Sequence, residues 1–165
     1  MNLAVKYSIL ENGDIIDMGR AKLSHNRALS KLKDAFSSVV EDPCEVFQEQ
    51  TYRWKEDTAP YRQPDISIVC DASSENGLDI DNAPWFILEA LSKSTEKIDK
   101  TEKMELYAKV GVQEYWLLDP DTLLAECYIN KGGTFAFAKN INIREAESIS
   151  FLTKEDVVIN VSKIK

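Results

Sequence analysis

The spacing of apolar and polar residues changes along the chain and predicts first strands, then a helix. Residues 4–18 alternate with a period of two around the turn dipeptide Asn12-Gly13, which predicts a β-hairpin. Residues 24–40 instead carry apolar side chains at the 3.6-residue spacing of a helix, and Ser24 is placed to cap its first turn. The chain is therefore expected to begin with a hairpin and one amphipathic helix.

Three strands are predicted after this helix. They cover residues 44–54, 65–70 and 85–91, where β-branched and aromatic residues are concentrated. The third strand is apolar at every position except Glu89, and such continuous apolarity is typical of a central strand covered on both faces. Residues 71–83 are predicted to be a loop.

The second half of the chain predicts a crossover followed by antiparallel strands. A helix over residues 94–110, ended by Gly111, stands between the strand that carries Glu89 and a strand over 114–118, which predicts a right-handed parallel crossover. The remaining strands are predicted over residues 123–129, 134–138, 147–151 and 156–161. We expect residues 1–165 to form one α/β domain, with a core of helix, three strands, helix and strand on a mixed sheet.

The composition limits the kinds of catalytic and metal site that this domain can contain. The single histidine, His25, is incompatible with a multi-histidine metal site, and it leaves serine-histidine-aspartate catalysis only if His25 is the base. A metal would therefore be held by oxygen ligands, which favours Mg2+, Mn2+ or Ca2+. The three cysteines are odd in number and far apart, so we expect buried free thiols at Cys44, Cys70 and Cys127.

The net charge and the hydropathy limit which binding partners and which cellular compartment are expected for this protein. The net charge of −8 counts against indiscriminate binding to nucleic acid, and it predicts binding that is weak, salt-sensitive or confined to one face. No apolar run approaches the roughly 20 residues that span a membrane. The first residues also lack the pattern of a signal peptide. We therefore expect a cytoplasmic protein with no membrane partner.

Two carboxylates and a lysine-bearing helix are the strongest candidates for chemistry. A charge in a buried strand is costly unless it is paired or bound to a metal, which singles out Glu89. Asp65 opens the preceding strand, so both carboxylates would project from one region of the sheet if the strands are neighbours. Mg2+ takes one or two carboxylates with water and phosphate oxygens. Lys103, and with it Lys100, lies on a helix stripe that should face Glu89.

Each of these residues also has a structural interpretation when taken alone. Asp65 follows a proline and is typical of a turn that opens a strand. The lysines of the helix alternate with Glu96, Asp99 and Glu102, as they do on a solvent-exposed face. The combination of acids and lysine, in this order and on these elements, favours a metal-dependent phosphodiesterase site.

Two long segments resemble a known family. PDISIVCD (residues 64–71) and FILEALSKSTEKIDKTEKMELYAKVGVQEYWLLDP (residues 86–120) resemble the signature of the Uma-two family, whose members are described as restriction endonucleases of the PD-(D/E)XK nuclease superfamily. The resemblance is weaker upstream, where YSILENGDIIDM (residues 7–18) and His25 resemble the family's opening hairpin and first helix. It implies a restriction-endonuclease-like αβββαβ core with an N-terminal hairpin and a C-terminal β-meander.

The resemblance also implies roles for particular residues. Asp65 is implied to be the motif aspartate and Glu89 the motif acid, both binding the metal together with the backbone carbonyl of Ala90. The motif lysine normally stands two residues after that acid, where this chain has Leu91, and Lys103 matches a lysine that takes its role from the helix. The accessory candidates are Lys100, Tyr107, which is expected mainly to pack, and His25, as a minor substrate contact or a capping residue.

These observations lead to one preferred function and two alternatives. The preferred function is a Mg2+- or Mn2+-dependent endonuclease that hydrolyses phosphodiester bonds of nucleic acid, DNA in the first instance. The acidic charge, and Ser8 where many family members carry an acid, motivate the first alternative, a nuclease-fold interaction or regulatory module acting as a homo-oligomer such as a dimer. The second alternative is a metal-dependent phosphoesterase with a small substrate.

Overall fold

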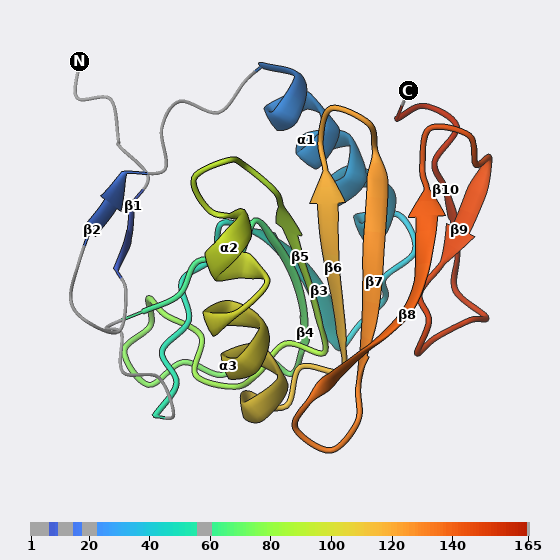
Figure 1. The fold of residues 1–165 in the computed structure, drawn as a ribbon. Coiled ribbons are helices and arrows are strands. Elements are labelled where there is room, and N and C mark those ends of the chain that lie inside the picture. Colours follow the sequence, from blue (N-terminus) through green and yellow to red (C-terminus); the bar gives the residue numbers. More distant parts are fainter. Residues whose placement is uncertain (1–6, 10–14, 18–22, 56–60, 165) are drawn as a thin grey trace, which may run out of the picture.

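A six-stranded sheet forms the centre of the fold in the computed structural model (Figure 1), which describes residues 7–9, 15–17, 23–55 and 61–164. The strands lie in the order β3-β4-β5-β6-β7-β8. Their bounds are β3 (Cys44–Gln48), β4 (Ile66–Cys70), β5 (Phe86–Ala90), β6 (Glu114–Asp119), β7 (Leu124–Asn130) and β8 (Phe135–Asn142). Strands β5 and β6 are parallel and all other neighbours are antiparallel, which confirms the predicted mixed sheet and its single crossover.

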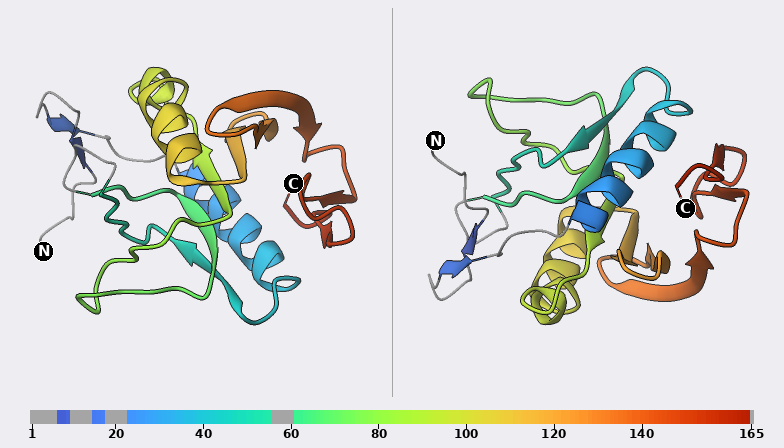
Figure 2. Two further views of the ribbon diagram at one scale, coloured as in Figure 1. Left: turned by 90° about the horizontal axis from the view of Figure 1, so that it is seen from below. Right: turned by 90° about the horizontal axis from the view of Figure 1, so that it is seen from above.

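One face of the sheet is covered by α1 (Leu23–Ser37), as the two views of Figure 2 show. The predicted apolar stripe of this helix is buried, and Phe36 lies in an aromatic cluster with Phe86, Trp116 and Phe151. The ring centroids of Phe36 and Phe86 are 5.4 Å apart in an edge-to-face arrangement, which aromatic pairs favour. This face of the sheet is therefore the main hydrophobic core.

The opposite face is covered by α2 (Glu96–Asp99) and α3 (Glu102–Val110), which connect β5 to β6. Its core contains buried tyrosines, among them Tyr52, Tyr107 and Tyr115, whose rings are large and whose hydroxyl groups can still donate hydrogen bonds. Glu89 belongs to this face, because strand pleating places it with Ile87 and away from Leu88. The buried Glu89 and the buried tyrosines thus lie together on the face that α3 covers.

The helix predicted over residues 94–110 is interrupted. It forms the short α2 and the longer α3, with the break at Lys100 and Thr101, where the backbone of Thr101 leaves the helical region. Gly111 ends α3 with a left-handed conformation, as predicted. Among the described residues, no helix combines the length and the apolar character that crossing a membrane requires.

The strand predicted over residues 44–54 is too long. Strand β3 ends at Gln48, because Glu49 has a left-handed backbone with φ of 53°. Beyond this point Tyr52 forms isolated bridges to Arg62 and to Ile80 instead of continuing β3. The chain therefore folds back over the face that carries Glu89.

The elements at the two ends of the chain match their predictions. Strands β1 (Tyr7–Ile9) and β2 (Ile15–Asp17) pair antiparallel, while the predicted turn at Asn12-Gly13 lies outside the described residues. Strands β9 (Ser148–Ser150) and β10 (Val158–Asn160) also pair antiparallel. Ile149 and Ile159 of this second pair join the core on the α1 face.

The prediction of three free thiols is wrong for two of the cysteines. Cys44 and Cys70 form a disulfide between the first residue of β3 and the last residue of β4, which are direct partners in the antiparallel register. Their separation of 26 residues conceals this neighbourhood in the sequence. Cys127 is a buried free thiol, as predicted. Burial is the main reason that its pKa is raised, so it stays a neutral thiol at physiological pH.

Truncation of Phe36 should remove the centre of the α1-side core. Phe36→Ala is expected to lower the free energy of unfolding by about 3–5 kcal/mol, because the side chain is fully buried among three other aromatic rings. Urea unfolding followed by tryptophan fluorescence measures the change. Phe137→Ala is the control, since Phe137 is 57% exposed on β8 and should cost about 1 kcal/mol or less. Equal losses in the two variants would contradict the assigned core.

Candidate functional site

The register of β4 and β5 places Asp65 opposite Glu89. These strands are antiparallel, with Ile66 paired to Leu88 and Ser67 to Ile87, and one further step brings Asp65 across from Glu89. Directly opposed residues of an antiparallel pair have Cβ atoms about 4.5–5.5 Å apart and project to the same face. Both side chains are buried, Asp65 being 5% and Glu89 2% exposed. The register therefore places the two sequence-predicted acids across from each other, Asp65 just before β4 and Glu89 within β5.

Asp65 is anchored to the backbone beside Glu89. Its Oδ2 atom accepts a hydrogen bond of 2.8 Å from the amide of Ala90. The carboxylate thus reaches across from β4 to the residue that follows Glu89 on β5. This contact ties the side chain of Asp65 to the backbone next to Glu89. The group of Ala90 that contacts Asp65 is its amide.

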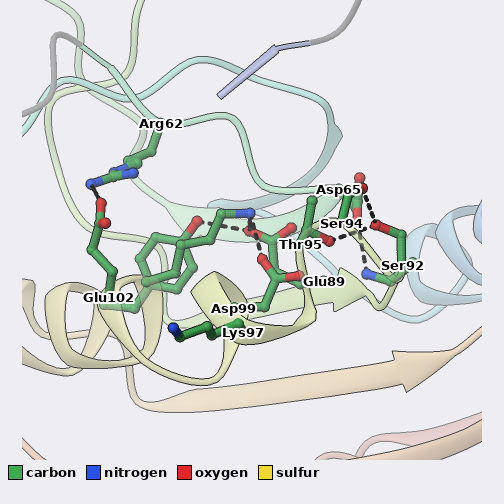
Figure 3. A network of polar contacts seen from close by, with 12 residues as sticks. Arg62, Asp65, Glu89, Ser92, Ser94, Thr95, Lys97, Asp99 and Glu102 are labelled. Atoms are coloured by element: carbon green, nitrogen blue, oxygen red, sulfur yellow. Dashed lines mark hydrogen bonds and ion pairs between the residues drawn. The ribbon is translucent and has the colours of Figure 1, made fainter. Parts of the chain in front are cut away.

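Lys103 lies between two carboxylates. Its Nζ atom is 3.1 Å from Glu89 Oε1 and 2.7 Å from Asp99 Oδ1 (Figure 3). Burial alone would lower the pKa of Lys103, but the negative charges of Glu89 and Asp99 outweigh burial and raise this pKa above its ordinary value. Lys103 is therefore a cation at neutral pH although its side chain is almost completely buried.

Tyr107 completes the surroundings of Glu89. Its hydroxyl group donates a hydrogen bond of 2.8 Å to the same Oε1 atom that faces Lys103. Burial, and then the charge of Glu89, raise the pKa of Tyr107 well above the ordinary value, so the phenol stays protonated and remains a donor. The ring packs edge-on against Tyr115 and Trp54, so Tyr107 both packs, as predicted, and orients the carboxylate of Glu89.

A second ion pair continues this network along α3. Arg62 is buried, and its Nη2 atom is 2.6 Å from Oε1 of Glu102, the first residue of α3. Figure 3 draws this pair beside the cluster around Glu89. Within this set of six side chains, two cations lie among four carboxylates. The six members are Arg62, Asp65, Glu89, Asp99, Glu102 and Lys103.

The donor set fits a divalent cation. Asp65 and Glu89 offer the hard carboxylate oxygens that such an ion prefers. In the part of the chain that the structure describes, no group of three or more histidine, cysteine, aspartate or glutamate side chains could hold a metal. A site of two carboxylates is sufficient for Mg2+, which completes its shell with water and substrate oxygens.

Two accessory candidates point elsewhere. The Nζ atom of Lys100 is 3.1 Å from both Glu96 and Glu126, so this lysine binds α2 to β7 rather than approaching Glu89. His25 lies in the first turn of α1, the helix that covers the other face of the sheet. The structure therefore brings Asp65, Glu89, Lys103 and Tyr107 together, without Lys100.

Sequence reasoning missed Asp99 and Arg62. Asp99 was expected on a solvated helix face, but the structure buries it to 1% exposure because α2 packs against the sheet. The spacing of Asp99 and Lys103, four residues apart, was the signal that could have found it. Arg62 gave no signal, since its place depends on the return of the chain past β3.

A known family model matches most of the chain. The sequence model of the Uma2 (Uma-two) family, described as "Putative restriction endonuclease", matches residues 2–150. This match includes every residue of the cluster around Glu89. It agrees with the resemblance found in the segments at residues 64–71 and 86–120.

Individual proteins extend this similarity. The uncharacterized protein slr1290 of Synechocystis sp. is 27% identical over 119 residues, which cover 71% of this chain but only 63% of that protein. Another Synechocystis protein, the uncharacterized sll1609, is 27% identical over 133 residues, or 78% of this chain and 75% of that protein. The crystal structure of a putative nuclease belonging to DUF820 from Anabaena variabilis has a TM-score of 0.69 with 20% identity. The matched region covers 92% of this chain and 86% of the Anabaena chain, and the match confirms the restriction-endonuclease-like fold.

Loss of Lys103 should destabilise the protein. At neutral pH, Lys103→Met is expected to cost about 3–5 kcal/mol, because Glu89 and Asp99 then lose their shared buried cation. The raised folded-state pKa means that the stabilisation by Lys103 is complete at neutral pH and is lost only as the pH rises through that pKa.

Urea unfolding of wild type and Lys103→Met at about pH 5 and about pH 8 measures this effect. The difference should be about the same at the two pH values, because both lie far below the raised pKa of Lys103. Lys97→Met is the control, because Lys97 is exposed on α2 and should change stability little at either pH. A cost for Lys103→Met that is no larger than that of Lys97→Met would contradict the buried network.

Proposed function

Because the chain belongs to the Uma2 family of restriction-endonuclease-like proteins, we propose that it is a divalent-metal-dependent endonuclease acting on nucleic acid, with DNA as the first substrate to test. One observation carries the proposal. The register of β4 and β5 places Asp65, just before β4, across from Glu89, and a buried lysine ammonium lies 3.1 Å from Glu89. Two carboxylates and a cation at this spacing suit the hydrolysis of a phosphodiester, in which negative charge develops on the phosphate.

Asp65 and Glu89 would hold the metal, together with the backbone carbonyl of Ala90. A bound Mg2+ or Mn2+ supplies Lewis-acid stabilisation of the phosphate and a water of lowered pKa. The protein's part is to keep the two carboxylates in place before the metal arrives. The Ala90 amide does this for Asp65, and the Tyr107 hydroxyl group does it for Glu89.

Lys103 would act as a fixed positive charge. Since its pKa is raised by Glu89 and Asp99, it keeps its proton at neutral pH and is unsuited to accept one from water. An ammonium group in a site shielded from solvent stabilises the charge that develops on the scissile phosphate and can orient the attacking water. This role replaces that of a lysine directly after β5, where this chain has Leu91.

The acidic net charge favours a second candidate, an interaction module that retains the nuclease fold. A charge of −8 opposes the counter-ion release that drives most binding to nucleic acid. Calorimetric titration with Mn2+ separates the two candidates, because the interaction module needs no metal. Binding at millimolar Mn2+ that is lost in Glu89→Gln supports the nuclease, and absence of binding supports the module.

The nuclease activity should depend on both acids and on the lysine. In a plasmid-nicking assay with Mn2+, Asp65→Asn, Glu89→Gln and Lys103→Met should each lower the rate at least about 100-fold, as removal of a group that stabilises transition-state charge does. Circular dichroism confirms that each variant is folded at the assay temperature.

Asp71→Asn is the matched control for the nicking assay. Asp71 follows the other end of β4 and is exposed, so its substitution should leave the rate unchanged. Nicking that survives both Glu89→Gln and Lys103→Met would overturn the assignment. Turnover of small phosphodiesters without DNA cleavage would show that the substrate is a small molecule and not nucleic acid.

A further inference from the structure

Asp99 makes the shorter of the two ion pairs of Lys103. Its Oδ1 atom is 2.7 Å from the Nζ atom of Lys103, whereas Glu89 is 3.1 Å from the same ammonium. Asp99 is only 1% exposed, so this charge is held away from water. A carboxylate that is buried to this extent is stable only with a partner of opposite charge, and Lys103 provides it.

The break between α2 and α3 fixes the position of Asp99. Asp99 is the last residue of α2, and Lys103 is the second residue of α3, four positions later. The backbone carbonyl of Asp99 accepts a hydrogen bond of 3.1 Å from the hydroxyl group of the buried Tyr115 on β6. Asp99 is therefore tied to the sheet through its backbone and to the catalytic candidate Lys103 through its side chain.

A second pair on the same helices has the same spacing but a different environment. Glu96 and Lys100 are also four residues apart and lie 3.1 Å from each other, but their side chains are 53% and 35% exposed. Water competes for such an exposed pair, so it holds neither side chain firmly. The buried Asp99–Lys103 pair excludes this competition.

We propose that Asp99 is a positioning residue that holds the ammonium group of Lys103 beside Glu89, and thereby sets the place of Lys103 for the proposed nuclease reaction. The inference rests on that proposed function. A lysine side chain has four rotatable bonds, and Glu89 would have to share its oxygens with a metal. Asp99, which lies outside the proposed metal ligands, gives Lys103 an anchor that does not depend on Glu89.

The first test observes Lys103 directly and requires no activity. Nitrogen-correlated NMR of lysine ammonium groups, at low temperature and mildly acidic pH, should show a restrained Lys103 signal that disappears in Lys103→Arg. In Asp99→Asn this signal should broaden or shift, because the shorter of its two ion pairs is lost. In Glu96→Gln, the matched control on the same short helix, it should be unchanged.

The second test asks whether Asp99 acts through Lys103. Asp99→Asn should lower kcat in the Mn2+ nicking assay about 10- to 100-fold with KM little changed, as loss of a residue that orients a catalytic group does. In the Lys103→Met background the same substitution should have no further effect on kcat. Glu96→Gln should keep the wild-type rate.

Failure of this inference is distinguishable from failure of the proposed function. An unchanged Lys103 signal in Asp99→Asn, or a further loss of kcat in the Lys103→Met background, overturns the role of Asp99. A wild-type protein without nuclease activity overturns the proposed reaction and with it the catalytic purpose of Asp99, whatever the NMR signal shows. Should Asp99→Asn not fold, the order parameter of the wild-type ammonium decides, since a Lys103 as mobile as the exposed Lys97 contradicts the inference.

Discussion

The burial of one negative charge, that of Glu89, is the constraint on which this site depends. A carboxylate on a fully buried strand is stable only when cations and donors are brought to it, and here they come from a different layer of the fold. Lys103 and Tyr107 both reach the same oxygen of Glu89 from α3. The packing of α3 on the sheet is thus electrostatic at its centre and apolar around it, where Leu106 and Val112 are buried.

The two faces of the sheet differ in what they contribute to stability and to the candidate site. On the α1 face, Phe36 and its aromatic neighbours bury mostly apolar surface, which is what a stable framework requires. A buried acid there, Glu114, accepts hydrogen bonds from Trp116 and from the backbone amides of Leu152 and Thr153. On the α3 face, buried charges interrupt the core and lower its contribution to stability. The stability of the α1 face compensates for the cost of burying charges on the α3 face, because the strands near Asp65 and Glu89 pack on their other side against the α1 core. Loss of stability in favour of pre-organised charge is a common property of functional sites.

The sequence was sufficient for the main elements and for the acids and lysine that the structure brings together as a candidate site, but not for the residues that support them. Local patterns identify β4, β5 and α3, and the single acid in an apolar strand identifies Glu89, because each signal lies within a few residues. The disulfide between Cys44 and Cys70, the place of Arg62 and the end of β3 at Glu49 depend on how distant segments meet, and no local period records that. Asp99 is an intermediate case. Its spacing to Lys103 is visible, but its burial follows from the break between α2 and α3, which the helical pattern does not show.

The origin of the lysine on a helix has a consequence for how such a site is switched off. Where acid and lysine share one strand, only unfolding of the sheet separates them. Here Glu89 belongs to β5 and Lys103 to α3, so detachment of a single helical segment would leave the acids in place and remove the cation. Segments of this size open more readily than a sheet interior does. The candidate site is in effect assembled from two parts, so its completeness depends on the docking of α2 and α3 on the sheet and not only on the integrity of the sheet.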